Sequence, residues 1–156
     1  MSVLVAGIGN LFFGDDGFGV AVAQRLAGAP PPRARVEDYG IRAIHLAFAL
    51  SDPLGPPDLC IIADCMARGG APGTLYVVEP DLATTGGVAD AHGMNLPVVF
   101  AAVRELGGQM PRTLIVGCEP ASLEPGIGLS DIVEGAVPAA IEMIRDLLST
   151  HHEAHP

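Results

Sequence analysis

Short apolar runs alternate with segments of helical periodicity along most of the chain. Most of the runs are rich in Val, Ile, Leu and Ala, as is typical of parallel strands that are buried on both faces. The runs that predict strands are 2–7, 35–39, 59–64, 74–78 and 113–118. The segments that predict helices, with apolar residues at helical spacing, are 20–26, 41–50, 96–106 and 131–148.

Strands that alternate with helices predict an α/β domain whose twisted sheet is mostly parallel, five-stranded and covered by helices on both faces. The length of 156 residues fits one such domain, which we assign to residues 1–150. Residues 151–156 hold three of the five histidines and predict a polar, disordered tail, where clustered imidazoles could bind metal incidentally.

Acidic residues outnumber basic ones by 18 to 8, so the formal net charge is −10. A nucleic acid or an anionic membrane surface is therefore a poor partner, because both attract basic proteins. With 49% hydrophobic and 17% charged residues, the chain is too apolar to be disordered. No apolar run approaches the ~20 residues that span a bilayer, and the first residues lack the basic segment of a signal peptide, which predicts a cytoplasmic protein.

The cysteines predict neither a disulfide framework nor a zinc site. Cys60, Cys65 and Cys118 are odd in number, lie in apolar surroundings and form no C-x-x-C motif. We therefore expect reduced thiols that are mostly buried.

The first strand leads into Gly7-Ile8-Gly9, which invites comparison with the dinucleotide-binding fingerprint. That fingerprint needs a third glycine where this chain has Phe12, and the helix start would carry Asp15 and Asp16, which repel phosphate. A nucleotide-binding function is therefore disfavoured. Carboxylates at a helix N-terminus indicate either a cation site or a helix cap, and the sequence leaves both open.

Asp64 closes the most apolar run, LCIIAD, and would lie at the carboxyl edge of a parallel sheet, where such sheets bind ligands. Asp16 follows the first strand and would lie at the same edge. Two carboxylates at one edge can share a proton or hold a metal ion. Asp64 could instead serve only as a cap or turn residue, a role in which Asp is common. His92, in the polar stretch 79–94, is either a solvated loop residue or the nitrogen ligand of an Asp, Asp, His set that suits nickel, zinc or manganese.

Four motifs occur in an order that resembles one known family. They are VLVAGIGNLFFGDDGFGV near the start, IIADCMA, the histidine of DAHGM, and GCEPASLEPGIGLS near the end. In this combination the chain resembles the hydrogenase maturation proteases, the endopeptidases that process the large subunit of [NiFe] hydrogenases. The resemblance extends from Val3 to about Leu148.

The resemblance implies a three-layer α/β sandwich and a cytoplasmic endopeptidase. Such an enzyme removes a C-terminal peptide from the precursor of the hydrogenase large subunit after nickel insertion. The family's catalytic and metal-contacting positions correspond to Asp16, Asp64 and His92, and the first of them is often Glu in relatives. The nickel would arrive with the substrate, so no tightly bound cofactor is expected in the free enzyme.

The resemblance also indicates a substrate-binding segment and a partner. The stretch DYGIRAIHL corresponds to a family loop near the cleft, which assigns substrate binding to Asp38, Gly40, Ile41 and Arg42. The expected partner is the [NiFe] hydrogenase large-subunit precursor, with no nucleic acid and no membrane, and the enzyme is expected to act as a monomer. The alternative from another class is a non-catalytic nickel-sensing chaperone for the same precursor.

Overall fold

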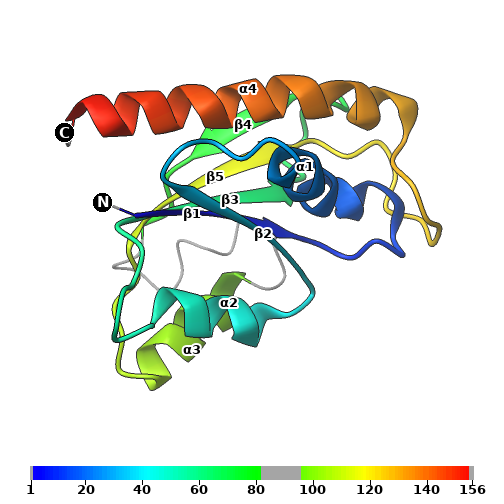
Figure 1. Ribbon diagram of the computed structural model, residues 1–156. Coiled ribbons are helices and arrows are strands. Elements are labelled where there is room, and N and C mark those ends of the chain that lie inside the picture. Colours follow the sequence, from blue (N-terminus) through cyan, green and yellow to red (C-terminus); the bar gives the residue numbers. More distant parts are fainter. Residues whose placement is uncertain (1, 82–95, 155–156) are drawn as a thin grey trace.

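A five-stranded sheet lies between two layers of helices in the computed structural model, which describes residues 2–81 and 96–154 (Figure 1). The strands are β1 (Val3–Ile8), β2 (Ala34–Gly40), β3 (Leu59–Cys65), β4 (Leu75–Val78) and β5 (Arg112–Cys118). The helices are the 3-10 turn η1 (Gly14–Gly17), α1 (Phe18–Ala27), α2 (Ala43–Leu50), α3 (Leu96–Glu105) and α4 (Asp131–Ala154). Of the helices described, none combines the length and the apolar content needed to cross a membrane.

The strand order in the sheet is β2-β1-β3-β5-β4. Neighbouring strands run parallel from β2 to β5, and the edge strand β4 pairs antiparallel with β5. The chain passes from β3 to β4 without a helix between them, and a short connection of this kind reverses the strand direction. The α/β three-layer sandwich with a mostly parallel five-stranded sheet is thus confirmed.

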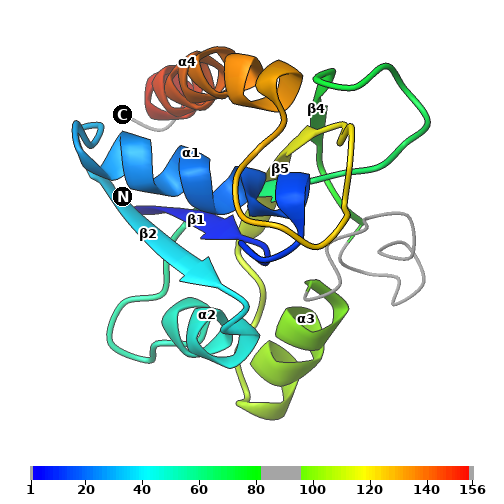
Figure 2. The same cartoon turned by 90° about the vertical axis from the view of Figure 1, so that its right-hand side faces the viewer.

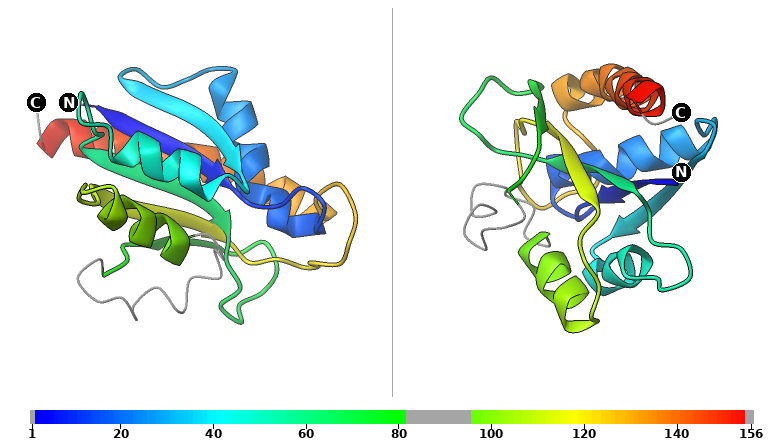
Figure 3. Two further views of the ribbon diagram at one scale, coloured as in Figure 1. Left: turned by 90° about the horizontal axis from the view of Figure 1, so that it is seen from below. Right: turned by 90° about the vertical axis from the view of Figure 1, so that its left-hand side faces the viewer.

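The central strands bury side chains on both faces of the sheet. Along β1, Val3 and Val5 pack with α1 and α4, whereas Leu4 and Ala6 pack with α2 and α3. Figures 1 and 3 show the same division, with α1 and α4 on one side of the sheet and α2 and α3 on the other. Burial on both faces explains why these strands read as continuous apolar runs instead of alternating ones.

The chain changes its direction across the sheet after β1. It passes from β1 through α1 on one face to β2, and then through α2 on the other face to β3, which lies on the far side of β1. The carboxyl ends of β1 and β3 therefore adjoin at a switch point, the place where open α/β sheets bind their ligands. Residues that follow β1 and residues that close β3 are brought together there.

Glycines around β1 allow this close packing. A Cβ at Gly19, in the first turn of α1, would collide with the carbonyl oxygens of Ile8 and Ala63. A Cβ at Gly9, whose φ is 139°, would collide with the carbonyl oxygen of Asp16. The glycine-rich motif thus lets η1 and α1 lie directly against the ends of β1 and β3. Its role here is packing.

The end of the chain differs from the expectation. The sequence predicts a disordered tail from residue 151, but α4 continues to Ala154, and His151 is only 8% exposed. The buried positions Val137, Ile144 and Leu148 lead to His151 at helical spacing, so this imidazole extends the apolar face of the helix. The prediction of disorder is therefore wrong for residues 151–154, because an imidazole can cover apolar surface as well as bind water.

Candidate active site

Asp16 and Asp64 lie at the switch point of the sheet. Asp64 is the penultimate residue of β3 and only 3% exposed, and Asp16 belongs to η1, which follows β1. Burial raises the pKa of Asp64 well above its ordinary value, and the negative charge of Asp16 raises it further, while the backbone N–H of Cys65 acts in the opposite direction. The two carboxylates are thus close enough to interact, as the sequence predicts.

The first loop orients the carboxylate of Asp16. Its Oδ2 accepts a hydrogen bond from the backbone N–H of Asn10 at 2.8 Å, and the side-chain oxygen of Asn10 accepts one from the N–H of Phe12 at 2.9 Å. Neither η1 nor α1 has a side-chain cap at its N-terminus. Of the two alternatives for Asp16, the structure therefore does not support the helix cap.

Asp15 holds the late loop of the chain against the first one. Its carboxylate is 1% exposed and accepts hydrogen bonds from the backbone N–H groups of Ala121, Ser122 and Ser130 at 2.8, 3.0 and 2.7 Å, and from the Ser130 hydroxyl. Burial alone would raise the pKa of Asp15, but these hydrogen bonds outweigh burial and hold the pKa below its ordinary value. Sequence reasoning missed this role, because Ala121 is 106 positions away.

The buried carboxylate of Glu119 is, like the role of Asp15, not predicted from the sequence. Glu119 directly follows β5 and is 5% exposed. Its Oε1 accepts hydrogen bonds from the backbone N–H groups of Arg68 and Gly70 and from the hydroxyl of Tyr76, each at 2.8 Å. The residue thereby fixes the turn that follows β3. The available signal was its position directly after an apolar run, the same signal that identified Asp64.

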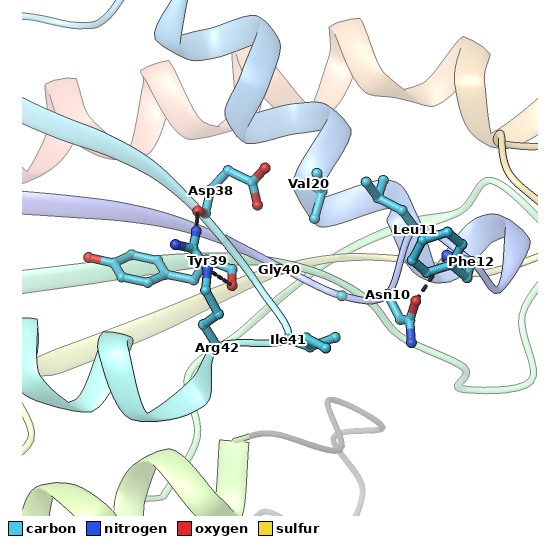
Figure 4. A pocket seen from close by; sticks show the side chains of 10 residues that line it. Asn10, Leu11, Phe12, Val20, Asp38, Tyr39, Gly40, Ile41 and Arg42 are labelled. Carbon is cyan, nitrogen blue, oxygen red and sulfur yellow. Dashed lines mark hydrogen bonds between the residues drawn. The ribbon is translucent and has the colours of Figure 1, made fainter.

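A pocket of about 250 Å³ opens beside the loop that orients Asp16, on the side of β2 (Figure 4). The residues predicted to bind substrate all line it: Asp38, Gly40, Ile41 and Arg42. Asn10, Leu11 and Phe12 lie across the pocket from them and were not predicted. Because Asn10 both lines the pocket and donates to Asp16, the pocket and this carboxylate share one loop.

Hydrogen bonds fix the polar side chains of the pocket. Arg42 donates from Nε to the carbonyl oxygen of Tyr39 at 3.1 Å and from Nη2 to the carbonyl oxygen of Asp38. The carboxylate of Asp38 accepts a hydrogen bond from Nε2 of Gln24 at 3.1 Å. The pocket thus combines an apolar wall with a few polar groups of fixed position, an arrangement that suits a short peptide segment.

The third predicted ligand, His92, lies outside the described residues. Within residues 2–81 and 96–154, no three His, Cys, Asp or Glu side chains converge in a way that could hold a metal ion. Asp16 and Asp64 by themselves do not make up a set of three such ligands. The joint assignment of Asp16, Asp64 and His92 stays a prediction.

All three cysteines are free thiols and buried, as the sequence predicts. Burial raises the pKa of Cys60 to about 12. Burial, aided by the charges of Asp15 and Glu119, raises the pKa of Cys118 to about 11. The pKa of Cys65 is raised by burial and then by the nearby carboxylates, that of Asp64 first. These thiols are protonated at neutral pH, although Cys65 is the direct neighbour of Asp64.

Asp64→Asn should make the folded protein more stable at neutral pH. A carboxyl group whose pKa is raised by folding costs stability as the pH rises above the pKa of the unfolded chain, about 3.9, and asparagine removes this cost. We expect a gain of about 0.5–2 kcal/mol at pH 7 that shrinks toward pH 4, measured by urea denaturation at both pH values. A variant less stable than the wild type at pH 7 would show that the surroundings of Asp64 stabilise its charge.

Asp15→Asn should have the opposite effect and cost about 2–4 kcal/mol at neutral pH, because one amide oxygen replaces a buried, ionised acceptor that receives several partly buried hydrogen bonds. The lowered pKa of Asp15 means that its contribution is present above about pH 3.9 and is lost as the pH falls through the folded-state value, so the difference should shrink in acid. Asp58→Asn is the control, since this exposed carboxylate accepts a bond from the Ser2 N–H and should matter by less than about 0.5 kcal/mol. Equal losses in the two variants, measured by urea denaturation, would contradict the role of Asp15.

Known proteins of one family resemble this chain in sequence. Residues 20–147 match the family model described as hydrogenase maturation protease. The hydrogenase 2 maturation protease of Escherichia coli is 33% identical over 152 residues, which cover 92% of this chain and 88% of that protein. The hydrogenase expression/formation protein HupD of Rhizobium leguminosarum is 32% identical, and the match covers 90% of this chain and 70% of that protein.

Solved structures of the same family resemble this chain in fold. The hydrogenase-maturating endopeptidase HybD of Escherichia coli has a TM-score of 0.79 at 28% identity, covering 99% of this chain and 94% of that one. The [NiFe] hydrogenase maturation protease HycI of Thermococcus kodakarensis has a TM-score of 0.70 at 28% identity, covering 95% of this chain and 92% of that one. From these similarities in sequence and in fold, we conclude that the chain belongs to the hydrogenase maturation protease family and is an endopeptidase.

Proposed function

We propose that this endopeptidase removes the C-terminal peptide of the large-subunit precursor of a [NiFe] hydrogenase after nickel has been inserted. The family acts on hydrogenase precursors, and dependence on nickel is the step that the proposal adds. The observation that carries it is the pair of Asp16 and Asp64, in which a buried carboxylate of raised pKa lies near a second carboxylate, beside a peptide-sized pocket.

The carboxylate pair favours a divalent cation. Ionising Asp64 near Asp16 places two negative charges at a desolvated edge, and the raised pKa of Asp64 reflects that cost. A divalent ion removes the repulsion, so Asp64 would release its proton when the ion arrives. In this proposal the ion belongs to the substrate, because two carboxylates and one imidazole make a weak, open site for a free metal.

Nickel held by cysteine thiolates of the precursor would contact Asp16, Asp64 and His92 together. An ion in this position can polarise the scissile carbonyl or activate a water molecule. Deprotonated Asp64 can alternatively accept a proton from the attacking water as a general base. In either case the pair acts only on a precursor that carries metal, so recognition of nickel loading and cleavage of the peptide become one event.

The pocket beside the first loop would hold the substrate chain next to the scissile bond. Its volume of about 250 Å³ lies below the ~300–1,000 Å³ of typical small-molecule sites, and it suits a few side chains of a peptide. Asp38, Gly40, Ile41 and Arg42 are the proposed substrate-binding residues. The Arg42 side chain donates hydrogen bonds to the carbonyl oxygens of Tyr39 and Asp38. This side of the pocket is therefore ordered before the substrate enters.

The proposal includes a cytoplasmic monomer that holds no tightly bound cofactor when free. Metal loading and cleavage of the precursor then take place in one compartment, and the metal enters and leaves with the substrate. No observation favours the non-catalytic nickel-sensing chaperone, because the family is one of endopeptidases.

Purified protein incubated with nickel-loaded and nickel-free large-subunit precursor tests the proposal. Mass spectrometry should detect the loss of a C-terminal peptide from the loaded precursor alone, because only the loaded form supplies the cation that the carboxylate pair needs. Binding without any loss of mass would indicate the chaperone. Equal cleavage of both precursors would overturn the dependence on nickel.

Variants of Asp16 test its contact with the ion in the same assay. Asp16→Asn should fold but cleave on the order of 100-fold more slowly, as expected if the charge contributes a few kcal/mol at the transition state, each ~1.4 kcal/mol being tenfold. Its amide oxygen can still accept from the Asn10 N–H, so the loop stays oriented. Asp16→Glu keeps the charge on a longer arm and should retain part of the activity. A fully active Asp16→Asn enzyme would remove Asp16 from the site.

A further inference from the structure

Two loops at the carboxyl edge of the sheet, 10–14 and 121–130, carry large apolar side chains that face solvent. These side chains are between 44% and 79% exposed and form what we term the apolar platform: Leu11, Phe12, Phe13, Leu123 and Ile127. Single exposed apolar residues are ordinary on protein surfaces, whereas several on adjoining loops mark an interaction site.

Backbone hydrogen bonds join the two loops into one surface. The N–H of Gly126 donates to the carbonyl oxygen of Phe12 at 2.8 Å, and the N–H of Gly14 donates to the carbonyl oxygen of Gly126 at 2.9 Å. Phe13 and Gly126 also form a parallel bridge. Figure 2 looks onto this end of the molecule, where the late loop passes around the first one. The platform residues therefore lie on neighbouring backbones although more than half of the chain separates them.

The platform is held in place by a buried group. Asp15 accepts hydrogen bonds from Ala121 and Ser122 at one end of the late loop and from Ser130 at the other. The loop is thus closed at its base, and Leu123 and Ile127 lie on its exposed part. A surface that is ordered before binding loses little conformational entropy when a partner covers it.

We propose that the apolar platform is the docking surface for the folded body of the large-subunit precursor, on an apolar face next to the nickel that the precursor carries. The inference rests on the function proposed above. Leu11 and Phe12 belong to both the platform and the pocket, so a partner whose tail enters the pocket meets the platform at once. The partner's face should be largely uncharged, because residues 10–14 carry no charge and residues 121–130 carry only Glu124.

A second copy of this chain fits the platform less well. A dimer formed through it would cover the pocket and the edge with Asp16 and Asp64, and so would exclude the substrate. A stable dimer also needs about 800 Å² from each partner, which a handful of partly exposed side chains supplies only in part. An enzyme–substrate contact needs less, since the metal and the tail add their own interactions.

Ile127→Asp and Leu123→Asp test the platform without touching the pocket or the carboxylate pair. Each should raise KM for the nickel-loaded precursor at least tenfold and change kcat by less than about twofold, because the charge disturbs docking and leaves the reacting groups in place. Leu54→Asp is the matched control: Leu54 is 96% exposed but precedes β3 at the amino edge of the sheet, and it should change neither constant. Melting curves of the three variants check folding.

Calorimetry with the precursor in an Asp64→Asn background measures docking without cleavage, and Kd should rise in parallel with KM. Unchanged KM and Kd in both platform variants, with wild-type cleavage intact, would overturn the docking surface and leave the proposed function standing. A lower kcat at unchanged Kd would overturn it as well, since the platform would then act on the reaction. A wild-type protein that does not cleave the loaded precursor would overturn the proposed function, and the Kd comparison would still decide the docking.

Discussion

The hydrogen bonds accepted by the Asp15 carboxylate hold together two loops at the edge of the sheet where the candidate active site lies. They join a turn that follows the first strand to a loop that precedes the last helix, because Ser130 is directly before α4. With this loop closed, the apolar platform, the first loop and the carboxylate of Asp16 have defined positions relative to one another. A buried carboxylate is suited to joining the two loops, because its two charged oxygens accept strong hydrogen bonds from several backbone N–H groups at once.

The buried carboxylates of the protein differ in what surrounds them. Asp15 and Glu119 each accept several hydrogen bonds, so their charges are compensated inside the protein. Asp64 is equally buried, but its surroundings oppose its charge. A group that the fold destabilises in its charged form is typical of functional sites, where a missing partner is supplied by the ligand. The contrast separates the structural carboxylates from the candidate catalytic one.

Sequence patterns predicted the five strands because buried parallel strands read as apolar runs, and they predicted α1 to α4 from apolar residues at helical spacing. Most of the predicted boundaries differ from the observed ones by a few residues. The apolar run that ends in Asp64 also predicted the position of this residue at the carboxyl edge of the sheet. The family resemblance singled out Asp38, Gly40, Ile41 and Arg42, which line a pocket, and their role in substrate binding stays a prediction. The sequence patterns did not predict that Asp15 holds the late loop by hydrogen bonds, because its partners are distant in the chain. They also did not predict that Leu11 and Phe12 line the pocket. The pocket lies between the loop after β1 and the end of β2. The topology of the sheet brings these segments together, so no local sequence pattern predicts the pocket.

The burial of the cysteines has a consequence for the traffic of metal in the proposed reaction. An enzyme that works beside an ion held by thiolates could compete for that ion by offering sulfur ligands of its own. Here Cys65 follows Asp64 directly, yet its thiol is buried and its raised pKa keeps it protonated, as is also true of Cys60 and Cys118. Burial thus withholds all three sulfurs, so in the proposed reaction the precursor's own thiolates would meet no competing sulfur ligand from the enzyme.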